Sequence, residues 1–132
     1  MKDLTITERR INDVLILDLA GQILIGENTL KLRGALRDYV KQGERKLLLN
    51  LADVTHIDSS GLGDLVAGHV TFEKNGGVLK LLNLTERVGE LMMITKLLTV
   101  FDTFSVEDEA VASFGTGSDE ESTETAPAVA GS

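Results

Sequence analysis

The sequence predicts an α/β domain with a mixed, mostly parallel β-sheet, an antiparallel N-terminal hairpin and about four helices. Two observations lead to this prediction. Short β-rich apolar runs alternate with segments of helical periodicity, and only a short turn separates the first two runs. Strands that alternate with helices pair in parallel through right-handed crossovers, whereas a short turn joins antiparallel neighbours. The expected order is therefore β-β-α-β-α-β-α-β-α.

The chain opens with the predicted hairpin. Residues 4–11 alternate loosely between apolar and polar, and residues 14–19 form a tight β-rich run. Asn12 and Asp13 supply the turn between these two strands. Gly21 is expected to end the hairpin, after which the chain leads into its first helix.

The first predicted helix begins near Asn28, a good N-cap residue, and ends at Gly43, which suits a left-handed C-terminal position. Its apolar positions recur at helical spacing, so one face is expected to be buried. These positions are Leu32, Ala35, Leu36, Tyr39 and Val40.

The middle of the chain predicts two central strands around a second helix. Residues 46–51 are almost continuously apolar, as in a strand buried on both faces. The second helix runs from about Ser60 to Lys74 and is stopped by residues 75–77 (Asn-Gly-Gly). Residues 78–84 form the next strand.

The last part of the domain predicts a helix opening at Thr85, a short strand over residues 100–104 and a final helix capped by Ser105. The domain is therefore expected to span residues 1–114. Residues 115–132 carry four acidic and no basic side chains and almost nothing to bury, so they predict a disordered acidic tail.

Composition narrows the function classes. The chain has 132 residues, 42% hydrophobic and 26% charged, which is typical of one folded globular domain. Its net charge of −8 argues against nucleic-acid partners and anionic membranes, because both require clustered Lys and Arg. Without cysteine there is no disulfide or thiolate metal site. With no signal peptide and no run of about 18 apolar residues, we expect a cytoplasmic protein that does not insert into a membrane.

The run from Thr55 to Gly63 holds the densest group of polar side chains on this apolar scaffold. Thr55, Asp58, Ser59 and Ser60 fall between a predicted strand and a predicted helix. One Asp or Ser suffices to cap a helix, and the glycines that follow could simply allow close packing. A hydroxyl at a helix N-terminus is also a suitable position for a phosphate. The turn is therefore either a cap or a phosphate site.

Enzyme and cofactor motifs are absent from the sequence. Neither serine of the turn has the Gly-x-Ser-x-Gly context of a hydrolase nucleophile. His56 and His69 are the only histidines, and they lack the spacing of a metal site. His69 falls on an apolar helical face, where a lone histidine is usually packed and hydrogen-bonded. A phosphate-binding P-loop does not occur either, so we expect a non-enzyme without metal or cofactor.

Three stretches of the chain resemble the STAS domains of bacterial anti-sigma factor antagonists. They are residues 47–53, residues 57–63 (Ile-Asp-Ser-Ser-Gly-Leu-Gly), and Gly76-Gly77 before a strand. The predicted element order over residues 4–114 agrees with that family. The resemblance implies a STAS fold and a binding module that frees a sigma factor by sequestering its anti-sigma factor.

The resemblance also implies how the turn works. Ser59 matches the serine that a partner, both serine kinase and anti-sigma factor, phosphorylates to block the complex, and a serine phosphatase resets the switch. Ser60 is a minor acceptor candidate. Asp58 would orient the Ser59 hydroxyl or repel its phosphate, and Gly61 and Leu62 complete the expected switch surface. The alternative is a STAS subunit of another complex, such as a stress-signalling assembly or a lipid-transport accessory protein. The oligomeric state stays open.

One stretch departs from the family pattern. Many members carry Gly-Glu-x-Asp after the second strand, whereas residues 21–24 here read Gly-Gln-Ile-Leu and lack both acids. Ile23, Leu24 and Ile25 are expected to approach the Ser59 turn and, if exposed, to form an apolar contact patch, with Leu24 in place of the expected acid. The alternative is that these residues extend the strand or anchor the first helix.

Overall fold

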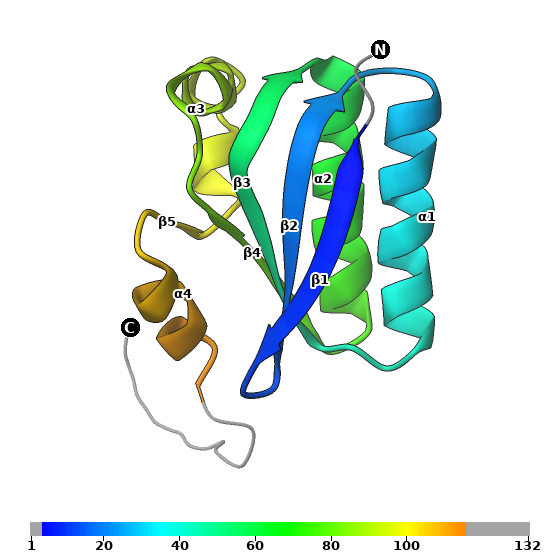
Figure 1. Cartoon of the computed structure of the whole chain (residues 1–132), viewed down its shortest axis with the longest axis vertical. Helices are drawn as coiled ribbons and strands as arrows, with labels where there is room; N and C mark the ends of the chain where they lie inside the picture. The colour runs from blue at the N-terminus through cyan, green and yellow to red at the C-terminus, as the bar shows by residue number, and fades with distance from the viewer. Residues whose placement is uncertain (1–3, 116–132) are drawn as a thin grey trace.

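The computed structural model describes residues 4–115 and confirms the predicted α/β architecture. One sheet has the strand order β1-β2-β3-β4-β5, with β1 and β2 antiparallel and every other pair parallel. Helices α1 and α2 cover one face of this sheet (Figure 1), and α3 packs against the same apolar cluster, whereas α4 packs on the other face. The predicted acidic tail falls, beyond Gly115, outside the described residues.

The N-terminal hairpin forms as predicted. β1 (Thr5–Ile11) pairs with β2 (Val14–Ile23) and ends in the register Ile11↔Val14. Asn12 adopts a positive φ of 56° at the turn, a conformation that Asn tolerates better than most residues.

The β1–β2 pairing ends with Thr5↔Ala20, so the hairpin ends at Gly21 as predicted, but the strand itself continues beyond that glycine. β2 continues to Ile23, and β3 (Lys46–Ile57) runs beyond the predicted end at residue 51. The two strands stay paired because their register shifts between Asp18 and Ala20 and again between Gly21 and Gln22. Such irregularities let a ladder continue through segments whose side chains no longer alternate. Both strands therefore reach the polar turn.

Helix α1 (Glu27–Lys41) begins differently from the prediction. Its N-cap is Gly26, at φ 116°, and no side chain caps it. Asn28 lies inside the first turn, where its side-chain amide donates to the Gln22 carbonyl oxygen at 2.7 Å. Gly26 therefore occupies the N-cap position, because the chain enters the helix in a conformation that Gly adopts readily. Gly43 has the predicted left-handed conformation, with φ 91°.

The remaining elements follow the predicted order with shorter strands. They are α2 (Ser59–Lys74), β4 (Val78–Leu82), α3 (Glu86–Ile94), the 3₁₀ helix η1 (Leu97–Thr99), β5 (Thr103–Phe104) and α4 (Glu107–Ser113). The predicted strand over 100–104 shrinks to two residues because the unpredicted η1 precedes it. Thr85 caps α3 as expected, but Ser105 does not cap α4, whose N-cap is Val106.

Two apolar clusters fill the two faces of the sheet. Alternate residues of the buried strands belong to different clusters, as the period of two along a strand requires. The larger cluster lies under α1, α2 and α3, and the smaller one lies under α4. The smaller cluster consists of Val14, Ile16, Leu48, Leu82, Ala110 and Val111. The larger cluster therefore holds the start of α2 against the sheet.

Candidate functional site

The polar turn lies where β2 and β3 end side by side. Ile23 and Ile57 pair at the carboxyl ends of these parallel strands, and both side chains are buried. Asp58 follows in extended conformation and donates its backbone N–H to the Ile23 carbonyl oxygen at 3.3 Å. The α2 helix begins at the next residue, Ser59. The turn thus connects the last strand pair directly to a helix N-terminus.

Asp58 caps α2 and also holds the neighbouring loop. Its Oδ1 accepts the Gly61 N–H at 2.9 Å, and its Oδ2 accepts the Ile25 N–H at 2.9 Å. The Ile25 N–H is the main cause that holds the pKa of the Asp58 carboxyl below its ordinary value, ahead of the opposing effect of desolvation. Asp58 therefore stays ionised at neutral pH and joins the β2–α1 connection to α2.

Ser59 is exposed and Ser60 is half-buried. No side-chain hydrogen bond of either hydroxyl is present in residues 4–115. Asp58 therefore caps α2 and binds the Ile25 N–H, and it is not a hydrogen-bond partner of the Ser59 hydroxyl. The Ser59 hydroxyl is free to meet another molecule at the first position of the helix.

Gly61 lets the first turn of α2 sit against β2. A Cβ atom at this position would lie 2.3 Å from the Ile23 carbonyl oxygen and 2.7 Å from the Ile57 Cγ1 atom. Close packing, one of the two readings of the glycines, therefore applies to Gly61. It does not apply to Gly63, because a Cβ there would meet nothing within 4 Å.

The residues flanking the serines divide into core and surface. Leu62 is only 3% exposed and belongs to the large core cluster, so it anchors the start of α2 instead of contributing to the surface expected of it. Ile23 is fully buried and extends the strand, whereas Ile25 is 76% exposed. Leu24 lies between them and is half-buried. The predicted approach of this connection to the Ser59 turn is present, and its exposed residue is Ile25.

The family model described as the STAS domain matches residues 5–110 of this chain. The chain belongs to the STAS domain family. A curated relative, the anti-sigma-B factor antagonist of Bacillus subtilis, is 38% identical over 91 residues, which are 69% of this chain and 81% of the relative. The crystal structure of TM1081 from Thermotoga maritima matches with a TM-score of 0.75 and 26% identity, covering 83% of this chain and 93% of TM1081.

The same fold occurs in the phosphorylated form of SpoIIAA, a Bacillus cell fate determinant. The two chains share 18% identity with a TM-score of 0.65, and the match covers 83% of this STAS domain and 98% of SpoIIAA. At this identity the likeness concerns the fold alone. Every helix of the described part of this STAS domain is too short or too polar to cross a lipid bilayer.

The two histidines of the STAS domain are engaged away from the serines. His56 Nδ1 lies 3.2 Å from Gln22 Nε2 at the outer ends of β2 and β3. His69 packs edge-on against Phe101, with ring centroids 5.2 Å apart, and its Nε2 lies 3.5 Å from Glu73 Oε1. Within the described residues, no group of three or more His, Cys, Asp or Glu could hold a metal ion.

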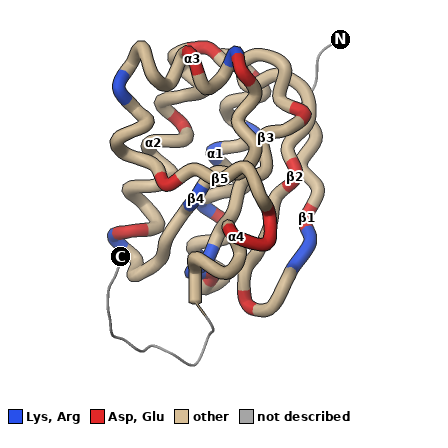
Figure 2. Tube along the Cα trace, turned by 90° about the vertical axis from the view of Figure 1, so that its left-hand side faces the viewer, with Lys and Arg blue, Asp and Glu red and all other residues tan. Residues whose placement is uncertain are grey.

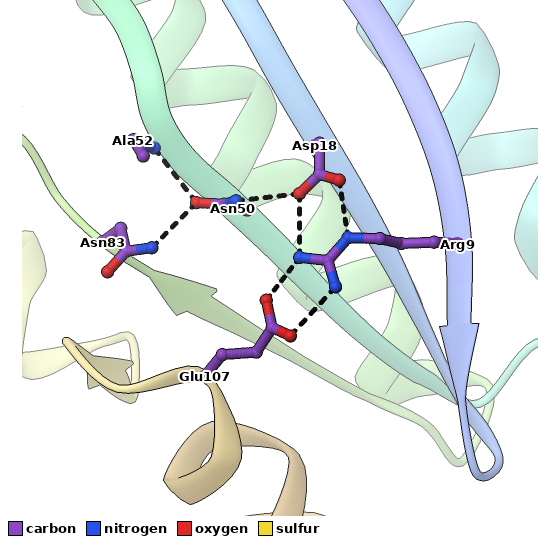
Figure 3. A network of polar contacts seen from close by, with 6 residues as sticks. All are labelled: Arg9, Asp18, Asn50, Ala52, Asn83 and Glu107. Atoms are coloured by element: carbon purple, nitrogen blue, oxygen red, sulfur yellow. Dashed lines mark hydrogen bonds and ion pairs between the residues drawn. The ribbon is translucent and has the colours of Figure 1, made fainter.

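A polar network across the outer face of the sheet was not predicted from the sequence. Arg9 Nε donates to Asp18 Oδ2 at 2.6 Å, and the Arg9 guanidinium also pairs with the Glu107 carboxylate of α4 (Figure 3). Asn50 Nδ2 donates to Asp18 Oδ1 at 2.8 Å, and Asn83 donates in turn to Asn50 Oδ1. The only sequence signal is that each of two buried strands, β2 and β3, carries one polar residue, Asp18 and Asn50, and these two residues pair in the sheet. The network fixes α4 on the sheet.

Proposed function

We propose that this STAS domain is an anti-sigma factor antagonist that binds its anti-sigma factor with the surface around Ser59 and is released when Ser59 is phosphorylated. The observation that carries the proposal is the exposed Ser59 at the first position of α2, on a turn held by Asp58. The relative from Bacillus subtilis, named as an anti-sigma-B factor antagonist, supports the class of partner.

A phosphate on Ser59 would act mainly through its charge. It adds about −1.5 to −2 elementary charges at neutral pH. The Asp58 carboxylate already occupies the Gly61 and Ile25 N–H groups, so the phosphate would sit beside an ionised carboxylate. No Lys or Arg side chain of the described residues bonds to residues 55–63. The added charge therefore stays on the surface, unneutralised.

Such a charge is sufficient for a switch. A dianion in the middle of a protein–protein interface costs desolvation and repels any acidic group opposite it. A loss of about 1.4 kcal/mol already lowers affinity tenfold, so a few kcal/mol separate bound from free at cellular concentrations. The rigid scaffold need not change shape for this to occur.

The proposal includes the two partners that the family resemblance implies. The anti-sigma factor would itself be a serine kinase that uses ATP, and a serine phosphatase would restore the free hydroxyl. Ser59 is the main acceptor because it is exposed, and Ser60 is at most a minor one because it is half-buried. In this scheme the STAS domain is a substrate and binding module, and the chemistry belongs to its partners.

The exposed Ile25, with Leu24 beside it, extends the proposed contact surface. Ile25 is tied to the Ser59 turn through Asp58, so an apolar side chain stands next to the phosphorylation site. Exposed apolar side chains near a switch are typical of a partner contact. The partner of this chain would therefore offer an apolar surface at the place where the partners of many family members meet acidic residues.

Phosphorylation in vitro tests the proposal. Each anti-sigma-type serine kinase of the source organism is purified singly and incubated with the chain and ATP, and the product is analysed by mass spectrometry. We expect one phosphate on Ser59 from the cognate kinase, none on Ser59→Ala, and normal incorporation into the control Ser60→Ala. Ser59→Asp should bind that kinase at least about tenfold more weakly than the wild type. Wild-type affinity in Ser59→Asp, or no binding to any such kinase, contradicts the proposal and favours a STAS subunit of another complex.

A further inference from the structure

Helix α3 presents large apolar side chains to solvent beside acidic ones. Met93 is 61% exposed and Ile94 is 72% exposed, at the last two positions of the helix. Glu90 lies three and four residues earlier and is therefore on the same helical face. Figure 2 looks onto this side of the molecule and shows acidic residues on both α3 and α4. This face is an apolar knob with an acidic rim.

A hollow with the opposite character lies between α1 and α2. Its volume is about 140 Å³, and its apolar wall is formed by Leu36, Ala67 and Gly68. A Cβ on Gly68 would come within 2.6 Å of the Leu36 Cδ1 atom, so the missing side chain is what brings the two helices together at this point. A protein cavity of about 150 Å³ accommodates a benzene molecule. The hollow is therefore large enough for the tip of one aliphatic side chain.

Two arginines of α1 line this hollow, and only one of them is paired. Arg33 donates through Nε and Nη2 to Asp64 Oδ1, at 3.1 and 2.9 Å. Arg37, one helical turn later, is exposed and has no ion pair within residues 4–115. Glu90 of α3 likewise has no ion pair among the described residues. The hollow thus offers an unpaired cation where the knob offers an unpaired anion.

We propose that the chain self-associates head to tail, with Ile94 of one copy seated in the α1–α2 hollow of a second copy and Glu90 facing Arg37. The knob belongs to α3 and the hollow lies between α1 and α2, so they are two different surfaces of one copy. The contact is therefore heterologous, so every open oligomer keeps one free knob at one end and one free hollow at the other. A second copy fits both features, in apolar size and in the sign of charge.

The association is expected to be weak and salt-dependent. Copies with a net charge of −8 repel one another at long range, and the Glu90–Arg37 attraction is screened as the ionic strength rises. Because salt screens the repulsion between copies as well as the Glu90–Arg37 attraction, the test is made at fixed ionic strength, where sedimentation velocity at increasing protein concentration should show a rising average mass.

Charge-reversed variants test the geometry. Glu90→Lys reverses the charge beside the knob, and Arg37→Glu reverses the charge beside the hollow. Each variant alone should therefore associate at least about tenfold more weakly than the wild type. A mixture of the two should associate as the wild type does, because the original Glu90–Arg37 pairing forms at one contact and the charge-reversed pairing forms at the next. The double variant Glu90→Lys/Arg37→Glu should regain association with reversed charges.

Two control variants separate this contact from general surface effects. Val106→Ser removes an exposed apolar side chain of α4, and Lys41→Glu reverses a charge of α1 that does not line the hollow. Both should associate like the wild type, whereas Ile94→Ser should not. Monomers at every concentration, association that survives in both charge-reversed variants, or no association in the mixture would overturn the proposal. Phosphorylation of Ser59 is measured separately, so either proposal can fail without the other.

Discussion

The backbone N–H of Ile25 donates to the side chain of Asp58 across the ends of two neighbouring strands, at 2.9 Å. The same carboxylate accepts the Gly61 N–H inside α2. One side chain thus orders both the loop that exposes Ile25 and the helix that exposes Ser59. The two halves of the proposed contact surface are therefore positioned together.

Two substitutions at Asp58 separate its roles. Asp58→Ala should lower the free energy of unfolding by about 1 kcal/mol through loss of the N-cap. Asp58→Asn keeps one acceptor oxygen, enough for the cap, but cannot accept both N–H groups. We expect Asp58→Asn to lose less stability than Asp58→Ala but to be measurably less stable than the wild type at neutral pH, with faster amide hydrogen exchange at Ile25. Unchanged exchange at Ile25 in both variants would show that Asp58 does not hold the loop.

The contribution of Asp58 should depend on pH with a definite sign. Its pKa in the folded chain is lowered, chiefly by the Ile25 N–H, whereas in the unfolded chain it keeps the ordinary value of about 3.9. The stabilisation is therefore complete above that ordinary value and is lost as the pH falls through the lowered folded value. The difference in unfolding free energy between wild type and Asp58→Asn should shrink over this acid range in denaturant titrations. A difference that stays constant from neutral to acid pH would contradict the role of the charge.

The two glycines of the first turn of α2 should respond in opposite directions to alanine. Gly61→Ala places a methyl group against the Ile23 carbonyl oxygen and should destabilise by about 1–3 kcal/mol. Gly63→Ala meets open space within a helix and should stabilise by about 0.5–1 kcal/mol. Thermal and urea unfolding of both variants measure this contrast. Equal effects would mean that α2 does not rest on β2 as described.

Lys96 carries a local backbone cost that glycine should relieve. Its φ of 66° lies in the left-handed region, which costs a residue with a Cβ atom roughly 1–2 kcal/mol. Part of that gain is offset by the greater freedom of glycine in the unfolded chain, so Lys96→Gly should raise stability by less than about 1 kcal/mol. Asp38→Gly, in the last full turn of α1, serves as the control and should be destabilising. Destabilisation in both variants would contradict this account.

The exposed loop next to Ser59 should matter for binding and little for folding. Ile25→Ser should weaken binding to the anti-sigma factor kinase by about tenfold or more without a measurable change in unfolding free energy. Leu24→Ala distinguishes contact from packing. Reduced stability with intact partner affinity in Leu24→Ala would rule out a contact role for Leu24, and intact affinity in Ile25→Ser would rule it out for Ile25.

The element order and the place of the polar turn between β3 and α2 could be predicted from local pattern alone. Alternating apolar runs identify strands and helices, and Asp58 was among the candidate caps. The ends of β2 and β3 could not, because irregular register lets polar residues such as Asp53 and His56 continue a strand. The caps expected at Asn28 and Ser105 were wrong, because a cap depends on the entry angle of the chain as well as on residue type.

Contacts between distant segments were beyond the reach of sequence patterns. The Arg9–Glu107 pair joins residues 98 positions apart, and the Ile25–Asp58 bond joins residues 33 positions apart. Neither leaves a periodic trace in the sequence, since each depends on how separate elements pack. Exposure was equally hidden: Ile23 and Ile25 are the same residue type, yet one lies in the core and the other in solvent.

The contact of Gly61 with the Ile23 carbonyl oxygen has a consequence for how information leaves this domain. A helix that begins in direct contact with a neighbouring strand has no room to shift, tilt or unwind there. We therefore expect the proposed phosphate on Ser59 to act on molecules that contact this turn, without a change on the far side of the domain. In the proposed function the domain thus acts through one surface and does not transmit a change of conformation.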